Sequence, residues 1–265
     1  MSNDPHANEA EREARKLVEE RLRSHLAEER LRIYLIDRLS SALLHNMRNT
    51  LQAVMGHAAL LRIPIGEGLA ASELSLKLQT AAEHCSENLD ALNAVLCLPR
   101  HRFLSSRIHA VIRSIEPLLH DAVKSHHFLR IQIDQTLDRV RVAVQPLSQL
   151  LLLLCILSTE TGEKGRTLQI DLAATNGADP KPPEVARQHP TINIRFCDAR
   201  SSFTDVERLH IETPADPPAR EQGEYPYWLL GALLIRTQAL VELVTTTSGV
   251  ALQVQWPLGT PAPLK

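Results

Sequence analysis

His45 lies in the segment His45-Asn46-Met47-Arg48-Asn49-Thr50-Leu51, where a nucleophilic side chain has polar neighbours. A neutral imidazole is a nucleophile, and histidine titrates near physiological pH. Apolar residues recur here every three or four positions, which predicts a helix with a buried seam made of Ile36, Leu39, Leu43, Met47, Leu51, Val54 and Ala58. His45 lies roughly 200° around that helix from Leu43 and Met47, so we expect it to point outward, on one stripe with Ser41, Arg48, Asn49 and Gln52. The alternative is a solvated histidine without a chemical role, because the chain has 12 histidines.

Two long helices are expected to carry this stripe. Residues 1–34 form a charged N-terminal extension, in which residues 9–32 are rich in Glu and Arg and read as a helix. It is either a solvated start of the His45 helix or a signal-receiving module. The His45 helix should run to about residue 62, where Pro64, Gly66 and Gly68 break it, and a second helix should cover residues 72–98, with Ser72 as N-cap. Residues 35–98 thus form a helical hairpin, and two hairpins would pair into a four-helix bundle in a homodimer.

The overall composition limits the class of protein. The chain has 265 residues, and 44% of them are hydrophobic. Its formal net charge is −2, so the overall charge gives no attraction to nucleic acid. Aromatic residues, at 3%, are too few for stacking on single strands. The longest apolar run, residues 150–157, is too short to cross a bilayer. Four cysteines show no metal-ligand spacing and no signal peptide is visible, so we expect a cytoplasmic protein with reduced cysteines, no metal and no membrane insertion.

The second half of the chain changes to a mixed pattern. Residues 99–106 read as a linker, and residues 107–260 as an α+β sandwich with helices on one face of a mixed sheet. Helices are expected at residues 107–124, 146–159 and 227–245. Strands are expected at residues 128–133, 139–144, 167–174, 191–197 and 251–256, and loops at residues 178–189 and 204–223.

The segment around His45 resembles the phospho-acceptor box of two-component histidine kinases, in which an exposed histidine is followed by an acid and then by Arg-Asn. The hairpin resembles the dimerisation and histidine-phosphotransfer (DHp) domain of that family. The order of elements in the second half resembles its catalytic and ATP-binding domain, the GHKL fold. Together the resemblance covers residues 35–258.

The chain departs from that family where ATP would bind. The two asparagines that hold Mg²⁺ and phosphates would fall at Leu153 and Leu157, and leucine offers no oxygen ligand. The adenine box keeps Asp198 but has Arg200 and Ser202 for its glycines, and the phosphate-binding glycine loop is reduced to Gly231. The acid that serves as general base after the histidine is Asn46, and an amide cannot accept that proton. We therefore expect no ATP-dependent kinase activity and no bound cofactor.

What remains resembles the ChpT-like histidine phosphotransferases. That resemblance implies that His45 accepts a phosphoryl group from the aspartate of one response-regulator receiver domain and passes it to another, with Mg²⁺ supplied by the receiver. Arg48 would stabilise the phosphoryl group or form a salt bridge, and Ser41, Leu44 and Gln52 would contact the receiver. A hybrid sensor kinase is a further candidate partner. His57 is the competing histidine, but no Arg-Asn pair follows it.

Two other functions stay open. The first is an aspartyl-phosphate phosphatase acting on a receiver, in which Asn49 would orient a water molecule. The second is a non-enzymatic pseudokinase scaffold that binds a regulator or a sensor kinase. Replacing His45 would separate the transferase from both, and replacing Asn49 alone would identify the phosphatase.

Overall fold

A computed structural model describes residues 5–60, 69–96, 105–123, 127–161, 166–174, 191–198, 203–214, 216–220, 222–246 and 249–257. Helix α1 (Pro5–Leu60) runs unbroken from the charged extension through the His45 segment, and α2 (Leu69–Leu96) lies beside its second half. The expected hairpin of helices is therefore present, with bounds close to those predicted. Ser72 lies inside α2 rather than at its N-cap, because the helix begins three residues earlier at Leu69.

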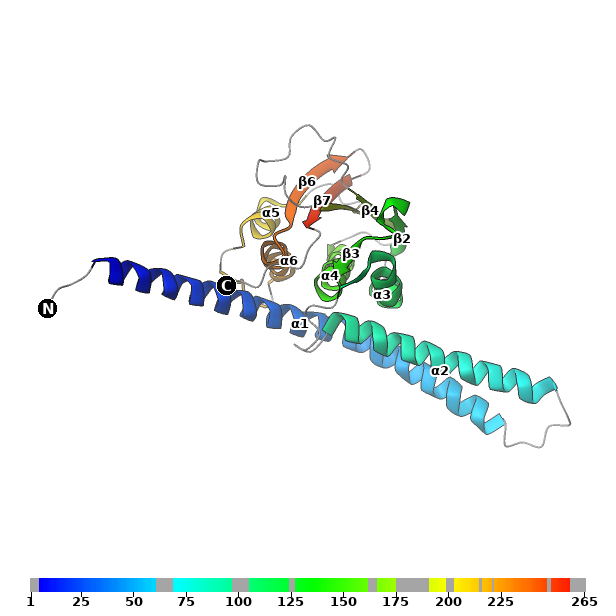
Figure 1. Cartoon of the computed structure of the whole chain (residues 1–265). Coiled ribbons are helices and arrows are strands. Elements are labelled where there is room, and N and C mark those ends of the chain that lie inside the picture. Colours follow the sequence, from blue (N-terminus) through cyan, green and yellow to red (C-terminus); the bar gives the residue numbers. More distant parts are fainter. Residues whose placement is uncertain are drawn as a thin grey trace.

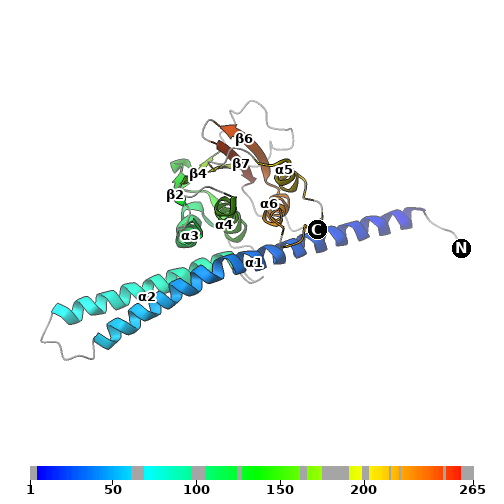
Figure 2. The same cartoon turned by 180° about the vertical axis from the view of Figure 1, so that it is seen from behind.

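An α/β domain sits on the middle of α1 (Figures 1 and 2). Its five-stranded sheet has the order β2-β4-β5-β7-β6, with β2 parallel to β4 and all other neighbours antiparallel. The strands are β2 (His127–Ile133), β4 (Arg166–Ala174), β5 (Thr191–Asp198), β6 (Leu240–Thr246) and β7 (Gly249–Pro257). Helices α3 (Ile108–Val123), α4 (Val144–Thr161) and α6 (Tyr225–Arg236) lie between this sheet and α1. The α+β class with a mixed sheet is confirmed.

Two short strands form a second, small sheet. Strand β1 (Ser105–Arg107) pairs antiparallel with β3 (Arg141–Ala143). A strand was expected over residues 139–144, but not its partner, which overlaps the end of the expected linker. The expectation was incomplete because β1 has only three residues and no alternating pattern.

The core lies between the sheet and the helices. Alternate residues of the central strands point inward, as a sheet covered on one face requires: Leu168, Ile170, Leu172, Ile192, Ile194, Phe196, Leu252, Val254 and Trp256. Helix α3 buries a single face, whereas α4 is buried all round from Leu147 to Ser158. A helix that is apolar on every side lies inside a core. Burial also raises the pKa of the Cys155 thiol on α4, so this cysteine stays protonated.

Two predictions for the region after β5 were wrong. Residues 204–223 were expected to be a loop, but they contain α5 (Asp205–Glu212). The side chain of Thr204 accepts a hydrogen bond from the Glu207 backbone N–H at 3.2 Å, and the Glu207 carboxylate accepts one from the Thr204 N–H at 2.7 Å. This capping box starts α5, and its Thr-x-x-Glu signature was present in the sequence.

The helix expected over residues 227–245 ends at Arg236, and β6 follows. Gln238 has a φ of 57°, and the N–H groups of Gln238 and Ala239 donate to the carbonyls of Ile235 and Leu234. These bonds form a Schellman motif, which usually has glycine at this position. Because Gln238 stands in place of the glycine, the sequence gives no stop signal. In the part of the chain that the structure describes, no helix has the length and apolarity needed to cross a membrane.

Candidate functional site

The face of α1 that carries His45 is exposed wherever its side chains are described. Asn49, Gln52 and Gly56 follow His45 by one, two and three turns, and all three are exposed, as is Arg48. The side chains of Ser41 and His45 lie outside the described residues. Thr50 and Val54, on the opposite side of the helix, are half-buried instead. The described positions that follow His45 by whole turns therefore lie on an exposed face of α1.

Leu44 belongs to a different face of the helix from His45. It shares a stripe with Leu51 and Met55, seven and eleven residues on, and the three side chains are 65%, 53% and 70% exposed. Leu51 and Ile36 were expected in a buried seam, but both side chains are exposed within a single chain. Val18, Leu22, Leu26, Ile33 and Ile36 continue the same stripe toward the N-terminus, and all are exposed.

Helix α6 runs antiparallel to α1, and its N-terminus lies against the part of α1 that precedes the His45 segment. Glu28 of α1 contacts Arg236 at the end of α6, whereas Tyr34 contacts Tyr225 at its start, with ring centroids 6.0 Å apart. The Arg38 guanidinium lies 5.5 Å from the centre of the Tyr34 ring. Arg38 precedes His45 by two turns on the same side of the helix, about 10 Å along the axis.

The segment before α6 also contacts α1. Arg220 forms an ion pair with Asp37. Burial raises the pKa of Tyr225, whereas the positive charges of Arg30 and Arg220 oppose that rise. Arg30, Arg38 and Arg220 therefore lie near the contact of α6 with α1, and Asp37 balances the charge of Arg220.

The two leucines that stand where the sequence resemblance would place ATP-binding asparagines lie deep in the core. Leu153 and Leu157 of α4 are 0% and 3% exposed. Arg200 and Ser202 lie outside the described residues, and so does the side chain of Asp198, the last residue of β5. The two leucines have packing partners on every side, so they contribute to stability and not to an open binding surface.

Gly231 has a structural role of its own. It lies within α6, and a Cβ atom built on it would lie 2.2 Å from the carbonyl oxygen of His210 and 2.8 Å from that of Ile211. Glycine here allows the backbone at the end of α5 to pack directly against α6, which a larger residue would prevent. The sequence interpretation of Gly231 as the remainder of a phosphate loop does not account for this close packing. Phe203 adds a contact of the same segment with Tyr227 of α6, with ring centroids 6.3 Å apart.

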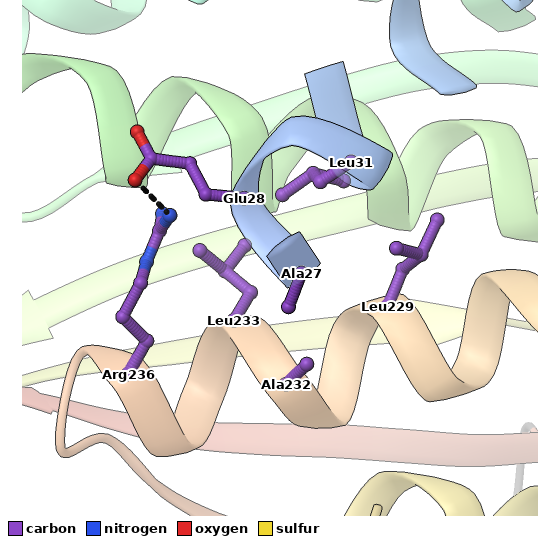
Figure 3. Close-up of a pocket in the computed structure, with 7 residues that line it drawn as sticks. All are labelled: Ala27, Glu28, Leu31, Leu229, Ala232, Leu233 and Arg236. Atoms are coloured by element: carbon purple, nitrogen blue, oxygen red, sulfur yellow. Dashed lines mark ion pairs between the residues drawn. The ribbon is translucent and has the colours of Figure 1, made fainter. Parts of the chain in front are cut away.

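A small pocket lies between α1 and α6 (Figure 3). Its walls are Ala27, Glu28, Leu31, Leu229, Ala232, Leu233 and Arg236. Leu31, Leu229 and Leu233 are almost fully buried, and the pocket is bounded on one side by the Glu28–Arg236 ion pair. Among the described residues, no three His, Cys, Asp or Glu side chains group closely enough to hold a metal ion.

Comparisons with known proteins found similarity in three-dimensional structure only. No protein-family model matches the chain, and no curated protein matches it in sequence. A bacterial phosphotransferase structure is similar over 84% of this chain and 96% of its own, with 14% identity and a TM-score of 0.42. The histidine kinase AdeS of Acinetobacter baumannii is similar over 82% of this chain and 98% of its own, with 10% identity and a TM-score of 0.40. Full-length ShkA in complex with AMPPNP is similar over 86% of this chain and 47% of its own, with 15% identity and a TM-score of 0.45. The function proposed below therefore rests on the residues of this chain.

Sequence reasoning did not find the residues that join α6 to α1. Glu28, Arg30 and Arg236 stood among many charged residues of helical segments, with no spacing to set them apart. Their partners are about 190 to 210 positions away in the chain, as with Glu28 and Arg236. Such a pair can be recognised in the sequence only when the two helices are already known to pack together.

Proposed function

We propose that this protein is a histidine phosphotransferase that relays a phosphoryl group between response-regulator receiver domains through His45 and does not use ATP. The single observation that carries the proposal is a contrast within the chain. The His45 face of α1 is exposed at Arg48, Asn49 and Gln52, whereas Leu153 and Leu157 are packed into the core. A phosphoryl group would thus come from outside the chain, since these two leucines offer no oxygen ligand for Mg²⁺ and are not open to solvent.

The proposed reaction is a direct displacement. The unprotonated ring nitrogen of His45 forms a bond to phosphorus while the phosphorus–oxygen bond of the receiver's aspartyl phosphate breaks, and the electron pair returns to the carboxylate. The proton on the other ring nitrogen can then pass to solvent. Arg48, one turn away and exposed, lies where its positive charge can stabilise the transferred group. The receiver supplies Mg²⁺, and catalysis consists mainly of positioning.

The proposed active form is a homodimer. Leu44, Leu51 and Met55 form an exposed apolar stripe on the hairpin, and large exposed apolar surfaces mark sites of association. A second copy would cover the stripe in a four-helix bundle, as in other paired helical hairpins. In this arrangement Leu44 serves the contact between copies, and Ser41 and Gln52 remain the proposed receiver contacts.

Phosphatase activity on a receiver is the second candidate. The Asn49 side chain is exposed one turn after His45, where its amide could orient a water molecule toward an aspartyl phosphate. A scaffold without chemistry is the remaining alternative and would need neither His45 nor Asn49.

A phosphotransfer assay with labelled receiver domains decides among the three. Transferase function predicts acid-labile label on the protein, which His45→Ala abolishes without unfolding it. Phosphatase function predicts loss of receiver label that survives His45→Ala and stops in Asn49→Ala. A scaffold leaves the receiver label unchanged in every variant. Label retained in His45→Ala, removed by His57→Ala, would show that the wrong histidine was chosen.

A further inference from the structure

A chain of charged and polar groups crosses the contact between α1 and the α/β domain. Arg32 donates to Glu29 at 2.8 Å and to Glu28 at 3.0 Å, all within α1. The other oxygen of Glu28 lies 3.3 Å from Arg236 of α6. Figure 3 marks this ion pair with a dashed line. Arg236 in turn donates to the side-chain oxygen of Gln149 on α4 at 3.3 Å. Arg236 is thus the group that joins three helices.

These groups are removed from water. The side chains of Glu28 and Arg32 are about nine-tenths buried, that of Arg236 is 19% exposed, and Gln149 is fully buried. Buried ion pairs add little net stability compared with apolar groups of the same shape, because both charges lose their hydration. Their geometry, however, is fixed, since a shift of one helix would leave a buried charge without its partner. Such a network fixes the relative position of the three helices more than it adds to the free energy of folding.

Aromatic rings form a second row along the same contact. The Arg30 guanidinium lies 5.7 Å from the centre of the Trp228 ring, and Trp228 stacks on Tyr225 at 6.1 Å. Tyr225 meets Tyr34 edge-on, and the Arg38 guanidinium lies over the Tyr34 ring. By helix geometry this row and the charged row lie on opposite sides of Leu31 and Leu35, which are buried. Two rows with an apolar centre between them oppose both sliding and rotation of α6 on α1.

We propose that Glu28 and Arg236 are positioning residues that hold the α/β domain at one place beside His45, so that the receiver meets a preformed surface. This inference rests on the phosphotransferase function proposed above. Neither side chain touches the phosphoryl group, since Glu28 precedes His45 by 17 residues on α1, about 25 Å along the axis. The surface they fix includes Arg38, two turns before His45, and Arg220, which forms the ion pair with Asp37.

The expected effect is on receiver binding. If only a fraction of molecules has the domain in place, the apparent affinity falls by that fraction. The chemistry at His45 is unchanged once the receiver is bound. Loss of the network should therefore raise KM for the receiver and leave kcat unchanged. A general loss of folding would instead lower the apparent kcat, because fewer molecules would be active.

Arg236→Met makes the test, because it keeps most of the aliphatic stem and removes the guanidinium. Its KM for a phosphorylated receiver should rise roughly 3- to 10-fold at constant kcat. Amide hydrogens of residues 27–39 and 225–236 should exchange faster, since these segments form the contact. Arg236→Lys, which keeps a positive charge beside Glu28, should recover much of the lost affinity. Arg113→Met, at an exposed arginine of α3, is the matched control and should change neither quantity.

The inference fails if Arg236→Met folds but leaves KM unchanged, or if kcat falls at constant KM. Should this variant not fold, Glu28→Gln makes the same test, because it removes the charge and keeps the side-chain shape. Unchanged amide exchange across the contact would overturn the positioning role whether or not transfer occurs. A wild-type protein that transfers no phosphoryl group would refute the proposed function, and the exchange measurement would still decide whether these residues hold the domain.

Discussion

In the proposed reaction, His45 attacks phosphorus through an unprotonated ring nitrogen, so transfer would depend on pH. Protonation of the ring in acid removes the attacking lone pair. We expect transfer from a receiver to slow as the pH is lowered. Initial rates of labelling between pH 5 and 8 measure this. The receiver's own loss of phosphate over the same range is the control, and a rate that rises on acidification would contradict attack by a neutral ring.

Gly231 gives the sharpest test of packing at a single residue. A methyl group there would lie 2.2 Å from the His210 carbonyl oxygen, which belongs to the backbone and cannot turn away. Gly231→Ala should lower the free energy of unfolding by about 1–3 kcal/mol or more. Gly56→Ala is the control, because nothing lies within 4 Å of its added Cβ. Alanine in that helix interior should raise stability by about 0.5–1 kcal/mol. Urea unfolding of both variants decides, and equal stability would refute the close contact.

Among the elements, α4 carries the expectation that ATP does not bind. Its apolar residues are buried on all sides, so we expect calorimetry with Mg-ATP to detect no binding in the micromolar range. Leu153→Asn should not restore binding, because one amide in a dry core does not make a metal site. It should instead cost about 3 kcal/mol of stability through lost packing and an amide buried without a partner.

The control for this variant is Leu209→Asn on α5, where the leucine is 60% exposed. Surface changes of this kind usually stay within about 0.5 kcal/mol. A micromolar dissociation constant for Mg-ATP, in either the native protein or Leu153→Asn, would overturn this interpretation of α4.

At the scale of the whole molecule, the exposed stripe on α1 predicts association of two copies. Leu51→Glu combined with Met55→Glu should give a monomer, because each new charge would have to be buried in the contact between the two copies. Sedimentation at micromolar concentration measures the change. Gln52→Glu, adjacent in sequence but on the His45 face, should stay dimeric. A native protein that sediments as a monomer would remove the dimer from the proposed function.

Several features followed from the sequence because they depend on neighbouring residues. The apolar periods of α1, α2 and α3 and the alternation in β2, β4, β5 and β7 predicted these elements nearly to their ends. The capping box at Thr204 was also readable, although it was not recognised. The Schellman motif at Gln238 was not readable, because the helix ends there in a residue that does not favour the left-handed conformation.

The functional hypothesis also came from the sequence, since His45, Arg48 and Asn49 are close together in it. Tertiary structure alone decided which apolar residues are covered. Leu51 and Leu153 both occur in helical apolar patterns, yet one is exposed and the other lies at the centre of the core. Tertiary structure also paired Glu28 with Arg236 and brought α5 against Gly231. Local periodicity determines which side chains share a face of a helix. Burial and ion pairing depend instead on which distant segments pack against that face.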